Sequence, residues 1–438
     1  MIVSSAFAGK TYAVLGLARS GLATVDTLVA SGARVVAWDS REEARALVEG
    51  KAELGDPMEI DLAGFDGIVV SPGVPLNRHP IAMRARLAGV PIIGDIELFA
   101  LARPTLPPHK VVGITGTNGK STTTALIHHI IEQAGYPAVM GGNIGLPILS
   151  QPPLEPNLHG VGVYVLELSS YQIDLTHSLD CDVAVLLNIT PDHLDRYDGF
   201  EGYVASKTRL FSMQSAEHVA VIDYGAEADF GILAHAPDGL SISFIDTADL
   251  PGAQSEWPAL QGPHNLQNAQ AATAVAKALG IDEATIANAL ASYASLPHRM
   301  QAVRTLNGVL YVNDSKATNA ASTAPALAAW PAKDGKPRIH WILGGVAKSD
   351  NLDECAPHFG NVAHAYTIGE AGHMFADLLR PHMAVDDSEM LSAAVRRAAR
   401  IAQPGDVVLL SPACASFDQF RDFEARGDAF AAAVAALE

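Results

Sequence analysis

The stretch that most constrains this chain is VVGITGTNGKSTTTALIHHI, residues 111–130, in which an apolar strand runs through a glycine-bearing loop into a helix. Such a loop binds phosphate, because glycines let backbone N–H groups turn toward an anion and the start of a helix favours negative charge. The usual phosphate loop reads GxxxxGK[ST]; here Ile114 replaces the first glycine and Gly116 supplies a tighter GxxGKS. Lys120 can reach the β- and γ-phosphates, and the Ser121 hydroxyl can ligate Mg²⁺. We therefore predict a nucleoside triphosphate site rather than an ordinary strand-to-helix turn.

Short Val, Ile and Leu runs alternate with Ala-rich helical stretches along the chain, a pattern typical of α/β units with mainly parallel sheets. At about 150 residues per domain, the 438 residues suggest three domains. The proline-rich segment 103–110 indicates a linker, because proline removes donors and stiffens the chain, and SLPHRM (295–300) marks a second boundary. We predict a Rossmann-like N-terminal domain (1–105), a central P-loop ATPase-type domain (106–298) and a Rossmann-like C-terminal domain (299–438).

The apolar runs also give expectations for individual elements. The expected strands are residues 11–17, 33–39, 66–73, 90–100, 161–168, 182–188, 308–315, 338–345, 364–369 and 406–413. The expected helices begin near Ser20 and cover 200–213, 264–279 and 282–294.

The composition excludes several classes of protein. The net charge of −19 opposes general attraction to nucleic acid or to an anionic membrane, so anionic ligands must be met by local Lys, Arg, metal ions and helix N-termini. Three cysteines without a CxxC pair indicate a reducing compartment and no disulfide framework. The N-terminus lacks a charged n-region, and no apolar run reaches the roughly 18 residues that span a bilayer. We expect a cytoplasmic protein that binds no nucleic acid and does not insert into membranes.

A second glycine pattern, VLGLARSGLA (14–23), follows the first expected strand. Gly16 and Gly21 match the dinucleotide fingerprint GxGxxG, but Ala18 replaces the middle glycine, which lets the backbone approach a pyrophosphate closely. Asp39 ends the second strand, where a ribose-binding acid would lie. The broken fingerprint favours a generic nucleotide or diphosphate site over NAD binding, with a purely structural turn as the alternative.

Polar residues follow two apolar strands of the central domain. Glu167 lies near the end of one of them, where a buried carboxylate is costly unless it is paired or metal-bound. The next loop, 186–197, brings Asp192, His193 and Asp195 to the same sheet edge, where doubly wound sheets bind their ligands. Glu167 is thus a candidate Mg²⁺ ligand, with a hydrogen-bonded structural Glu as the alternative, and the loop taken alone also fits a simple turn.

Two expected helices carry polar residues with more than one interpretation. Lys207 shares a helical face, at i, i+4, i+7 and i+8 spacing, with Tyr203, Leu210 and Phe211. A lysine on an apolar stripe usually snorkels to solvent, but a desolvated lysine has a lowered pKa and can carry chemistry. Asn265 and Asn268 open another helix one turn apart; they can read a base edge, and taken alone they favour a helix cap.

Taken in order along the chain, these segments resemble the Mur ligase family. The matching segments are GITGTNGKST, GGNIG (141–145), ELSSYQ, NITPDHLDRY, KTRLF, GPHNLQNAQAA, LPHRM, NDSKATN (313–319), LGG (343–345) and SPACASFDQF (411–420). NDSKATN and SPACASFDQF resemble the D-glutamate-adding members, and the DNPR segment of the mesodiaminopimelate-adding members is absent from the sequence. The resemblance covers nearly the whole chain and is looser in the first domain, as Ala18 shows.

This resemblance implies an ATP-dependent amide ligase of peptidoglycan precursor synthesis. The carboxylate of UDP-N-acetylmuramoyl-L-alanine would take the γ-phosphate of ATP, and the amine of D-glutamate would then displace phosphate from the acyl phosphate. The substrate carboxylate must be activated because an oxide ion is a poor leaving group, whereas phosphate is a good one. The resemblance also implies two Mg²⁺ ions and a carbamate on Lys207, and we expect a monomer.

The resemblance assigns residues to four groups. For ATP it implies Gly116, Thr117, Asn118, Gly119, Lys120, Ser121, Thr122, Asn268, Arg299, Asp314 and Lys316. For catalysis it implies Lys120 on the phosphates, Ser121 and Glu167 on a first Mg²⁺, and Glu167, His193 and Lys207 on a second. For the UDP-substrate it implies Arg19, Ser20, Ser40, Arg41, Ser71 and Asn143. For D-glutamate it implies Thr318, Lys348, Ser416 and Phe423, although LGGVAKSDNL around Lys348 departs from the family's GGxDKG.

The sequence disfavours two other classes of function. Ala18 and the downstream GKS loop disfavour an NAD-dependent oxidoreductase, and a complete third α/β domain with SPACASFDQF disfavours a regulatory P-loop ATPase. The nearest alternative is a sister Mur-type or folylpolyglutamate-type amide ligase with a different acceptor. Because the site residues come from three domains, we expect domain closure to assemble the site.

Overall fold

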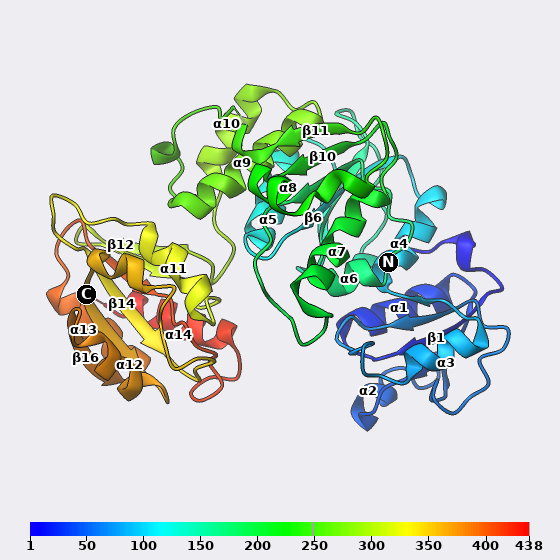
Figure 1. Cartoon of the computed structure of the whole chain (residues 1–438), viewed down its shortest axis with the longest axis horizontal. Coiled ribbons are helices and arrows are strands. Elements are labelled where there is room, and N and C mark those ends of the chain that lie inside the picture. Colours follow the sequence, from blue (N-terminus) through cyan, green and yellow to red (C-terminus); the bar gives the residue numbers. More distant parts are fainter. Residues whose placement is uncertain (248, 438) are drawn as a thin grey trace. The chain divides into compact units, whose positions relative to one another are not determined.

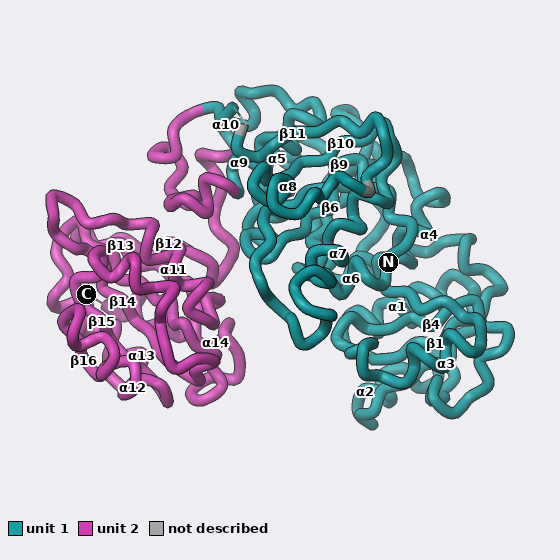
Figure 2. The backbone as a smooth tube through the Cα atoms, in the orientation of Figure 1, with its two compact units in different colours: residues 1–251, 268–289 teal, residues 252–267, 290–438 magenta. Residues whose placement is uncertain are grey.

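The computed structural model describes residues 1–247 and 249–437, which form three sheets with helices packed on them (Figure 1). Residue 438, the last of the expected C-terminal domain, lies outside the described residues. The chain divides into two compact units: unit 1 is Met1–Pro251 with Asn268–Ala289, and unit 2 is Gly252–Gln267 with Leu290–Glu438 (Figure 2). The first two sheets belong to unit 1 and the third belongs to unit 2.

The first sheet of unit 1 has the strand order β3-β2-β1-β4-β5, with every pair parallel. Its central strands are apolar and buried, as parallel strands covered on both faces require. The order reverses between β1 and β4, so the loops after these strands open onto one crevice. The strands are β1 (Thr11–Leu15), β2 (Arg34–Trp38), β3 (Glu53–Leu54), β4 (Gly67–Val70) and β5 (Ile92–Ile93), and the helices are α1 (Arg19–Ala30), α2 (Glu42–Ala46) and α3 (Ile81–Ala88).

The second sheet of unit 1 has the order β11-β10-β9-β6-β8-β7 and is also parallel throughout. Since β6 lies between β8 and β9, the loops that follow these three strands meet at one edge. The strands are β6 (His109–Thr115), β7 (Ala138–Gly142), β8 (Gly162–Glu167), β9 (Val183–Leu186), β10 (Val219–Ile222) and β11 (Ser241–Phe244). The helices of this part of the chain are α5 (Lys120–Gln133), α6 (Ser170–Asp174), α7 (Gly199–Ser212), α8 (Tyr224–Phe230), α9 (Pro263–Ala278) and α10 (Glu283–Ser292).

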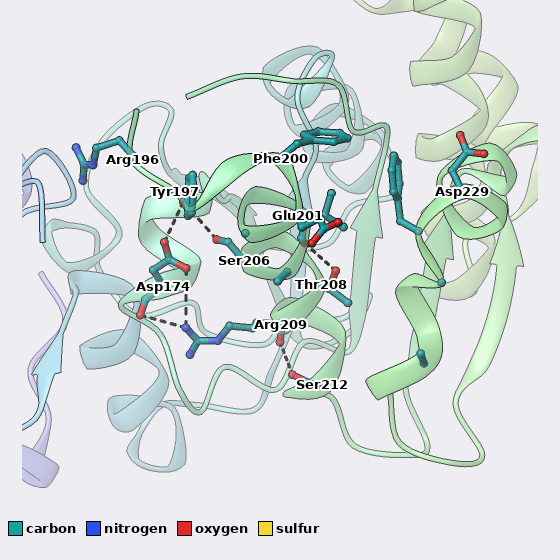
Figure 3. Close-up of a pocket in the computed structure, with 16 residues that line it drawn as sticks. Asp174, Arg196, Tyr197, Phe200, Glu201, Ser206, Thr208, Arg209, Ser212 and Asp229 are labelled. Carbon is teal, nitrogen blue, oxygen red and sulfur yellow. Dashed lines mark hydrogen bonds and ion pairs between the residues drawn. The ribbon is translucent and has the colours of Figure 1, made fainter. Parts of the chain in front are cut away.

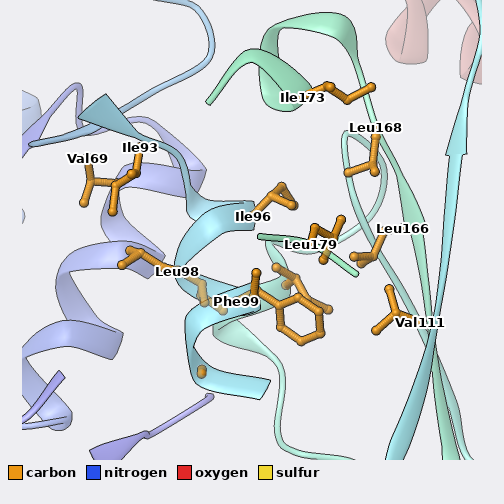
Figure 4. Close-up of a cluster of buried hydrophobic side chains, with 14 of the residues drawn as sticks. Val69, Ile93, Ile96, Leu98, Phe99, Val111, Leu166, Leu168, Ile173 and Leu179 are labelled. Atoms are coloured by element: carbon orange, nitrogen blue, oxygen red, sulfur yellow. The ribbon is translucent and has the colours of Figure 1, made fainter. Parts of the chain in front are cut away.

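Helix α4 (Asp95–Ala102) joins the two sheets of unit 1 through a shared hydrophobic core (Figure 4). That core contains residues of both sheets and of α4, among them Val69, Ile96, Phe99, Val111 and Leu166. Glu97, buried in the same helix, accepts hydrogen bonds from His177 N–H (2.6 Å), Ser178 N–H (2.9 Å) and Ser178 Oγ (2.7 Å). The two sheets of unit 1 are therefore held together by packing and by a satisfied buried carboxylate.

The sheet of unit 2 has the order β12-β13-β17-β14-β15-β16. Only β12 is antiparallel among its described strands; it forms a hairpin with β13 across Asn307 and Gly308, both of which have positive φ (51° and 78°), as a two-residue turn of this kind requires. The strands are β12 (Gln301–Leu306), β13 (Val309–Asn313), β14 (Ile339–Gly344), β15 (Val362–Ile368), β16 (Ala384–Glu389) and β17 (Val407–Leu410), and the helices are α11 (Ala320–Ala328), α12 (Gly372–Leu379), α13 (Leu391–Ile401) and α14 (Phe423–Ala435).

The α/β fold class expected from the sequence is confirmed, and the expected strands and helices lie within a few residues of the observed ones. Six strands were not expected: β3, β7, β10, β11, β12 and β16. The apolar run 90–100 forms only the short strand β5, because helix α4 begins at Asp95. The expected linker 103–110 is shorter than its prolines suggest, because a 3-10 turn occupies Arg103–Thr105 and β6 already begins at His109. The domain boundaries stay predictions. Within the described residues, the structure contains no helix with both the length and the apolar character needed to cross a membrane.

Candidate active site

The predicted phosphate loop lies between β6 and α5. Gly116 and Gly119 have φ values of +146° and +84°, which residues with a side chain rarely adopt. The segment after β9 holds the loop: Thr117 N–H donates to Asn188 O (2.9 Å), and Asn118 N–H donates to Asn188 Oδ1 (2.9 Å). Two neighbouring strand ends thus fix the shape of the loop.

Lys120 and Ser121 open α5, at the positive end of the helix dipole. Lys120 Nζ donates to Gly116 O (2.9 Å) and Thr117 O (2.8 Å), so the ammonium lies over the loop. Ser121 is buried and Thr122 is half-buried. This arrangement offers a phosphate a cation, a hydroxyl and the N–H groups of a helix start.

Asn268 of α9 lies directly against the loop. It is 2% exposed, and its Oδ1 accepts a hydrogen bond from Thr123 Oγ1 (3.1 Å). A Cβ added at Gly119 would lie 2.4 Å from the same oxygen, so the loop and the amide approach as closely as glycine allows. Asn265, the other candidate at the start of α9, donates to Gln261 O (3.0 Å), a local contact typical of a helix start.

Glu167 ends β8 next to the phosphate loop, where it pairs in register with Ile114, and it is 2% exposed. Asn143 Nδ2 donates to Glu167 Oε1 (2.9 Å), and Asn143 N–H donates to Glu167 O (2.8 Å). Glu167 Oε2 is buried and has no hydrogen-bond partner within the described ranges. Such an oxygen is costly unless a cation meets it, and Mg²⁺ prefers oxygen ligands. The Glu167 carboxylate and the Ser121 hydroxyl therefore fit a Mg²⁺ ion.

Lys207 is buried in α7, 1% exposed, so it does not snorkel to solvent. Its Nζ donates to Gly116 O (2.8 Å) and lies 4.6 Å from the centroid of the Tyr203 ring. Burial, helped by repulsion from Lys120, lowers the pKa of Lys207 to about 6, although carboxylates including Glu167 act in the opposite direction. The amine is therefore mainly neutral at pH 7, the state in which a lysine acts as a nucleophile.

His193 lies in the loop after β9 with a φ of +53°, a strained conformation for a residue with a side chain. Its side chain is half exposed, its ring centroid lies 5.1 Å from that of Tyr171, and its Nε2 lies 3.5 Å from Asp192 Oδ2. The described residues hold no group of three or more His, Cys, Asp or Glu side chains placed to bind a metal. A Mg²⁺ site with His193 thus needs other oxygen donors, and this ligand set stays a prediction.

The crevice of the first sheet carries the residues predicted for the UDP-substrate in the first domain: Arg19, Ser20, Ser40, Arg41 and Ser71, which follow β1, β2 and β4. Ser71 Oγ donates to Gly16 O (3.0 Å). Asp39, considered as a ribose-binding acid, accepts from Leu17 N–H (2.8 Å) and from Arg41 Nε (3.2 Å). The Asp39 carboxylate thus shapes the loop at the broken fingerprint.

The segment GGNIG connects this crevice to Glu167. Arg19 Nη2 donates to Gly145 O (2.8 Å), and Asn143 of the same segment holds the Glu167 carboxylate. Asn143, expected on the UDP-sugar side, therefore also positions the candidate metal ligand, a contact that the sequence did not indicate.

Unit 2 carries the remaining residues expected for ATP. Asp314 follows β13, is 7% exposed and accepts a hydrogen bond from Ser411 Oγ (2.8 Å); burial raises its pKa to about 7. Lys316 Nζ lies 4.0 Å from the centroid of the Phe423 ring, and Arg299 is half-buried before β12. Unit 2 thus gathers two cations and an acid at the end of one strand.

The residues expected for D-glutamate lie at the carboxyl ends of adjacent strands of unit 2. Thr318 follows β13, Lys348 follows β14, Ser416 follows β17, and Phe423 begins α14. Ser416 is buried, whereas Lys348 is exposed. Ligands of open α/β sheets bind at such an edge, so the placement is compatible with an amino-acid pocket.

Arg426 organises this edge and was not singled out from the sequence. It is 1% exposed, and its guanidinium donates to Ser315 Oγ (2.9 Å), Ser315 O (2.9 Å), Cys414 O (3.0 Å), Ala415 O (3.3 Å) and Gly344 O (3.4 Å). Burial lowers its pKa to about 10, so it remains charged. One side chain therefore ties together the segments after β13, β14 and β17.

Models of Mur ligase domains match most of the chain. They are described as Mur ligase MurD-like, N-terminal domain (residues 10–94), Mur ligase middle domain (114–235) and Mur ligase, glutamate ligase domain (298–414).

Two relatives that match the whole chain are both named UDP-N-acetylmuramoylalanine–D-glutamate ligase. The relative from Novosphingobium aromaticivorans is 65% identical over 100% of this chain and 97% of its own length, and that from Sphingopyxis alaskensis is 62% identical over 100% of both. Among solved structures, a MurF ligase from Thermotoga maritima in complex with ADP has a TM-score of 0.58 at 16% identity, over 99% of this chain and 97% of its own. UDP-N-acetylmuramate-alanine ligase MurC, also from Thermotoga maritima, has a TM-score of 0.56 at 17% identity, over 97% and 99%. The likeness to these two solved structures supports the fold of the chain.

Proposed function

The chain belongs to the Mur ligase family, and from this premise we propose that it joins D-glutamate to UDP-N-acetylmuramoyl-L-alanine with ATP, in peptidoglycan precursor synthesis. The observation that carries the proposal is the identity of 65% to a D-glutamate ligase over the whole chain. The buried Glu167 and Lys207 beside the phosphate loop supply the chemistry that such a ligase needs.

The reaction has two steps. A carboxylate oxygen of UDP-N-acetylmuramoyl-L-alanine attacks the γ-phosphorus of ATP, which gives an acyl phosphate and ADP. The amine of D-glutamate then attacks the acyl carbon, phosphate leaves, and the amine loses a proton. Lys120 and the N–H groups of the 116–121 loop hold the phosphates and favour the charge that develops on them.

Ser121, Glu167, His193 and Lys207 would hold Mg²⁺, with Ser121 and Glu167 on one ion and Glu167, His193 and Lys207 on the other. When bound, Mg²⁺ lowers the repulsion between the substrate carboxylate and the triphosphate. The unpartnered Glu167 Oε2 supports this assignment.

We further propose that Lys207 carries a carbamate. Its neutral amine would attack CO₂, forming an N–C bond and losing one proton, and the lysine would thereby become an anionic oxygen ligand. The carbamate nitrogen keeps one N–H, which can still donate to Gly116 O, the acceptor that Lys207 Nζ meets in this structure. Burial and the lowered pKa of Lys207 favour this reaction.

The other substrates would bind at the places that the resemblance implies. The uridine and diphosphate would lie against Arg19, Ser20, Ser40, Arg41 and Ser71, with Asn143 toward the sugar. Adenine and ribose would lie against Asn268, Arg299, Asp314 and Lys316. D-glutamate would meet Thr318, Lys348, Ser416 and Phe423.

Phosphate release from ATP tests the proposal. The full chain is assayed with UDP-N-acetylmuramoyl-L-alanine and, separately, D-glutamate, L-glutamate and meso-diaminopimelate. We expect release only with D-glutamate. Release with another amino acid instead would favour a sister ligase. A cytoplasmic location and a monomeric enzyme are further proposals, and light scattering of the purified chain tests the second.

A further inference from the structure

The turn after Ser71 and the loop that carries His193 hold each other in both directions. We name them the substrate turn (residues 71–78) and the His193 loop (residues 188–198). The guanidinium of Arg196 donates to three carbonyls of the substrate turn: Val74 O (3.0 Å), Pro72 O (3.3 Å) and Gly73 O (3.5 Å). In return, Asp195 O of the His193 loop accepts from Asn77 Nδ2 (3.1 Å) and Arg78 Nη2 (3.2 Å).

Two ring contacts lead from the Arg196 guanidinium to His193. The Arg196 guanidinium lies 4.1 Å from the centroid of the Tyr171 ring, and the Tyr171 ring lies 5.1 Å from the His193 ring. In Figure 3, Arg196 extends away from Tyr197 and from the Asp174–Arg209 pair that lines the neighbouring cavity of about 1150 Å³. Arg196 also lines that cavity, and its guanidinium donates to the carbonyls of the substrate turn.

The imidazole of His193 is half exposed and its backbone is strained at a φ of +53°. A strained backbone persists only where its surroundings impose it. The His193 ring contacts Asp192, which belongs to the same loop, and the rings of Tyr171 and Tyr203. Tyr171 thus supports the His193 ring and also carries the guanidinium that holds the substrate turn.

We propose that Arg196 and Tyr171 are positioning residues that couple occupation of the UDP-substrate crevice to the position of His193. Ser71 begins the substrate turn, and a ligand bound there orders residues 72–74. Their carbonyls fix the guanidinium, the guanidinium fixes Tyr171, and Tyr171 fixes the imidazole. This inference rests on the proposed function for the identity of the ligand, and it predicts that UDP-substrate and metal–nucleotide strengthen each other's binding by the same factor.

The coupling is measured without turnover. Mn²⁺, a paramagnetic substitute for Mg²⁺, is titrated with a non-hydrolysable ATP analogue by electron paramagnetic resonance, with and without UDP-N-acetylmuramoyl-L-alanine and in the absence of D-glutamate. For the wild-type chain we expect the Mn²⁺ dissociation constant to fall by about fivefold or more when the UDP-substrate is present. For Arg196→Gln we expect about the same constant in both cases, with the affinity for the UDP-substrate itself changed less than about twofold.

Arg209→Gln is the matched control, because Arg209 likewise donates to backbone carbonyls, but to those of Asp174 and Thr176. Tyr171→Phe keeps the ring and should keep the coupling, whereas Tyr171→Leu should lose it. As a second readout, the imidazole C–H signal of His193 should shift when the UDP-substrate alone is added to the wild-type chain and stay in place in Arg196→Gln.

Three outcomes would overturn the inference: a wild-type chain that binds the UDP-substrate without coupling, an Arg196→Gln chain with wild-type coupling, or an Arg209→Gln chain with an equal loss. A wild-type chain that fails to bind the UDP-substrate at all would instead overturn the proposed function, and this inference with it. The phosphate-release assay with D-glutamate separates the two cases.

Discussion

Replacing Gly119 by alanine adds one methyl group where the phosphate loop meets Asn268. The new carbon would lie 2.4 Å from Asn268 Oδ1 and 3.3 Å from Leu187 Cδ1. Because Asn268 is buried and bonded to Thr123, its side chain cannot retreat without losing that bond. Either the loop or the amide must therefore move by about 1 Å to restore an ordinary contact.

The cost has two parts. Alanine at a φ of +84° is in the left-handed region, which costs roughly 1–2 kcal/mol. Breaking the buried bond between Thr123 and Asn268 adds about 1–3 kcal/mol, because a buried polar group loses its partner. In the free chain a movement of the loop relieves this strain, so ATP binding has to return the loop to its strained position. The two costs together amount to at least about 2 kcal/mol, which raises the ATP dissociation constant roughly 30-fold or more.

The substitution Gly280→Ala separates the cost of the left-handed backbone from the cost of the contact with Asn268. Gly280 follows α9, has the same φ of +84°, and a Cβ there would meet no heavy atom of the described residues within 4 Å. This control should lose about 1–2 kcal/mol of stability and keep its affinity for ATP. Calorimetry with a non-hydrolysable ATP analogue and Mg²⁺ measures the affinity, and thermal unfolding measures the stability. Wild-type affinity in Gly119→Ala, or an equal loss in Gly280→Ala, would refute the reasoning.

Three further substitutions test the proposed roles. Lys120→Ala should abolish turnover and leave UDP-substrate binding nearly intact, because Lys120 follows a strand of the second sheet whereas the residues proposed for uridine and diphosphate follow strands of the first; an equal loss of UDP-substrate affinity in calorimetry would contradict this division. Lys207→Ala should be nearly inactive and regain part of its activity with acetate, and full activity without acetate would exclude a carbamate. In the wild type, the pKa of about 6 for Lys207 means that activity at limiting CO₂ should rise with pH as the amine becomes neutral and level off above about pH 7. Lys348→Ala should raise the KM for D-glutamate roughly ten- to a hundredfold, since charged hydrogen bonds contribute about 1.5–3 kcal/mol, with the KM for ATP unchanged; steady-state kinetics with an unchanged glutamate KM would remove Lys348 from the pocket.

The sequence predicted those features that are determined by residues close together in the chain. The GKS loop follows from glycines and a helix start. The apolar helical stripe around Lys207 left two outcomes open, snorkelling to solvent and burial, and the structure shows burial. Asn307–Gly308 is likewise a local hairpin signal, although β12 was not among the expected strands.

Other features depend on residues far apart in the sequence. Asn143 lies 24 residues from its partner Glu167, and Arg426 lies 111 residues from Ser315. Spacing within a segment carries no information about such contacts. Arg426 lies in the alanine-rich helix α14, where the local sequence predicts an exposed position for an arginine. Only the packing of that helix on the sheet shows that the side chain is buried.

The contacts of Arg426 bear on how this kind of protein can change over evolution. All but one of its acceptors are backbone carbonyls, which every amino acid possesses. Side chains at Cys414 and Ala415 can therefore be exchanged, within the space available, without removing an acceptor from the guanidinium. At Gly344 no side chain fits, because an added Cβ would lie 1.9 Å from Ile368 O. The contacts of Arg426 thus do not depend on which residues stand at 414 and 415, so new acceptor specificities can arise there by single replacements while these contacts are kept.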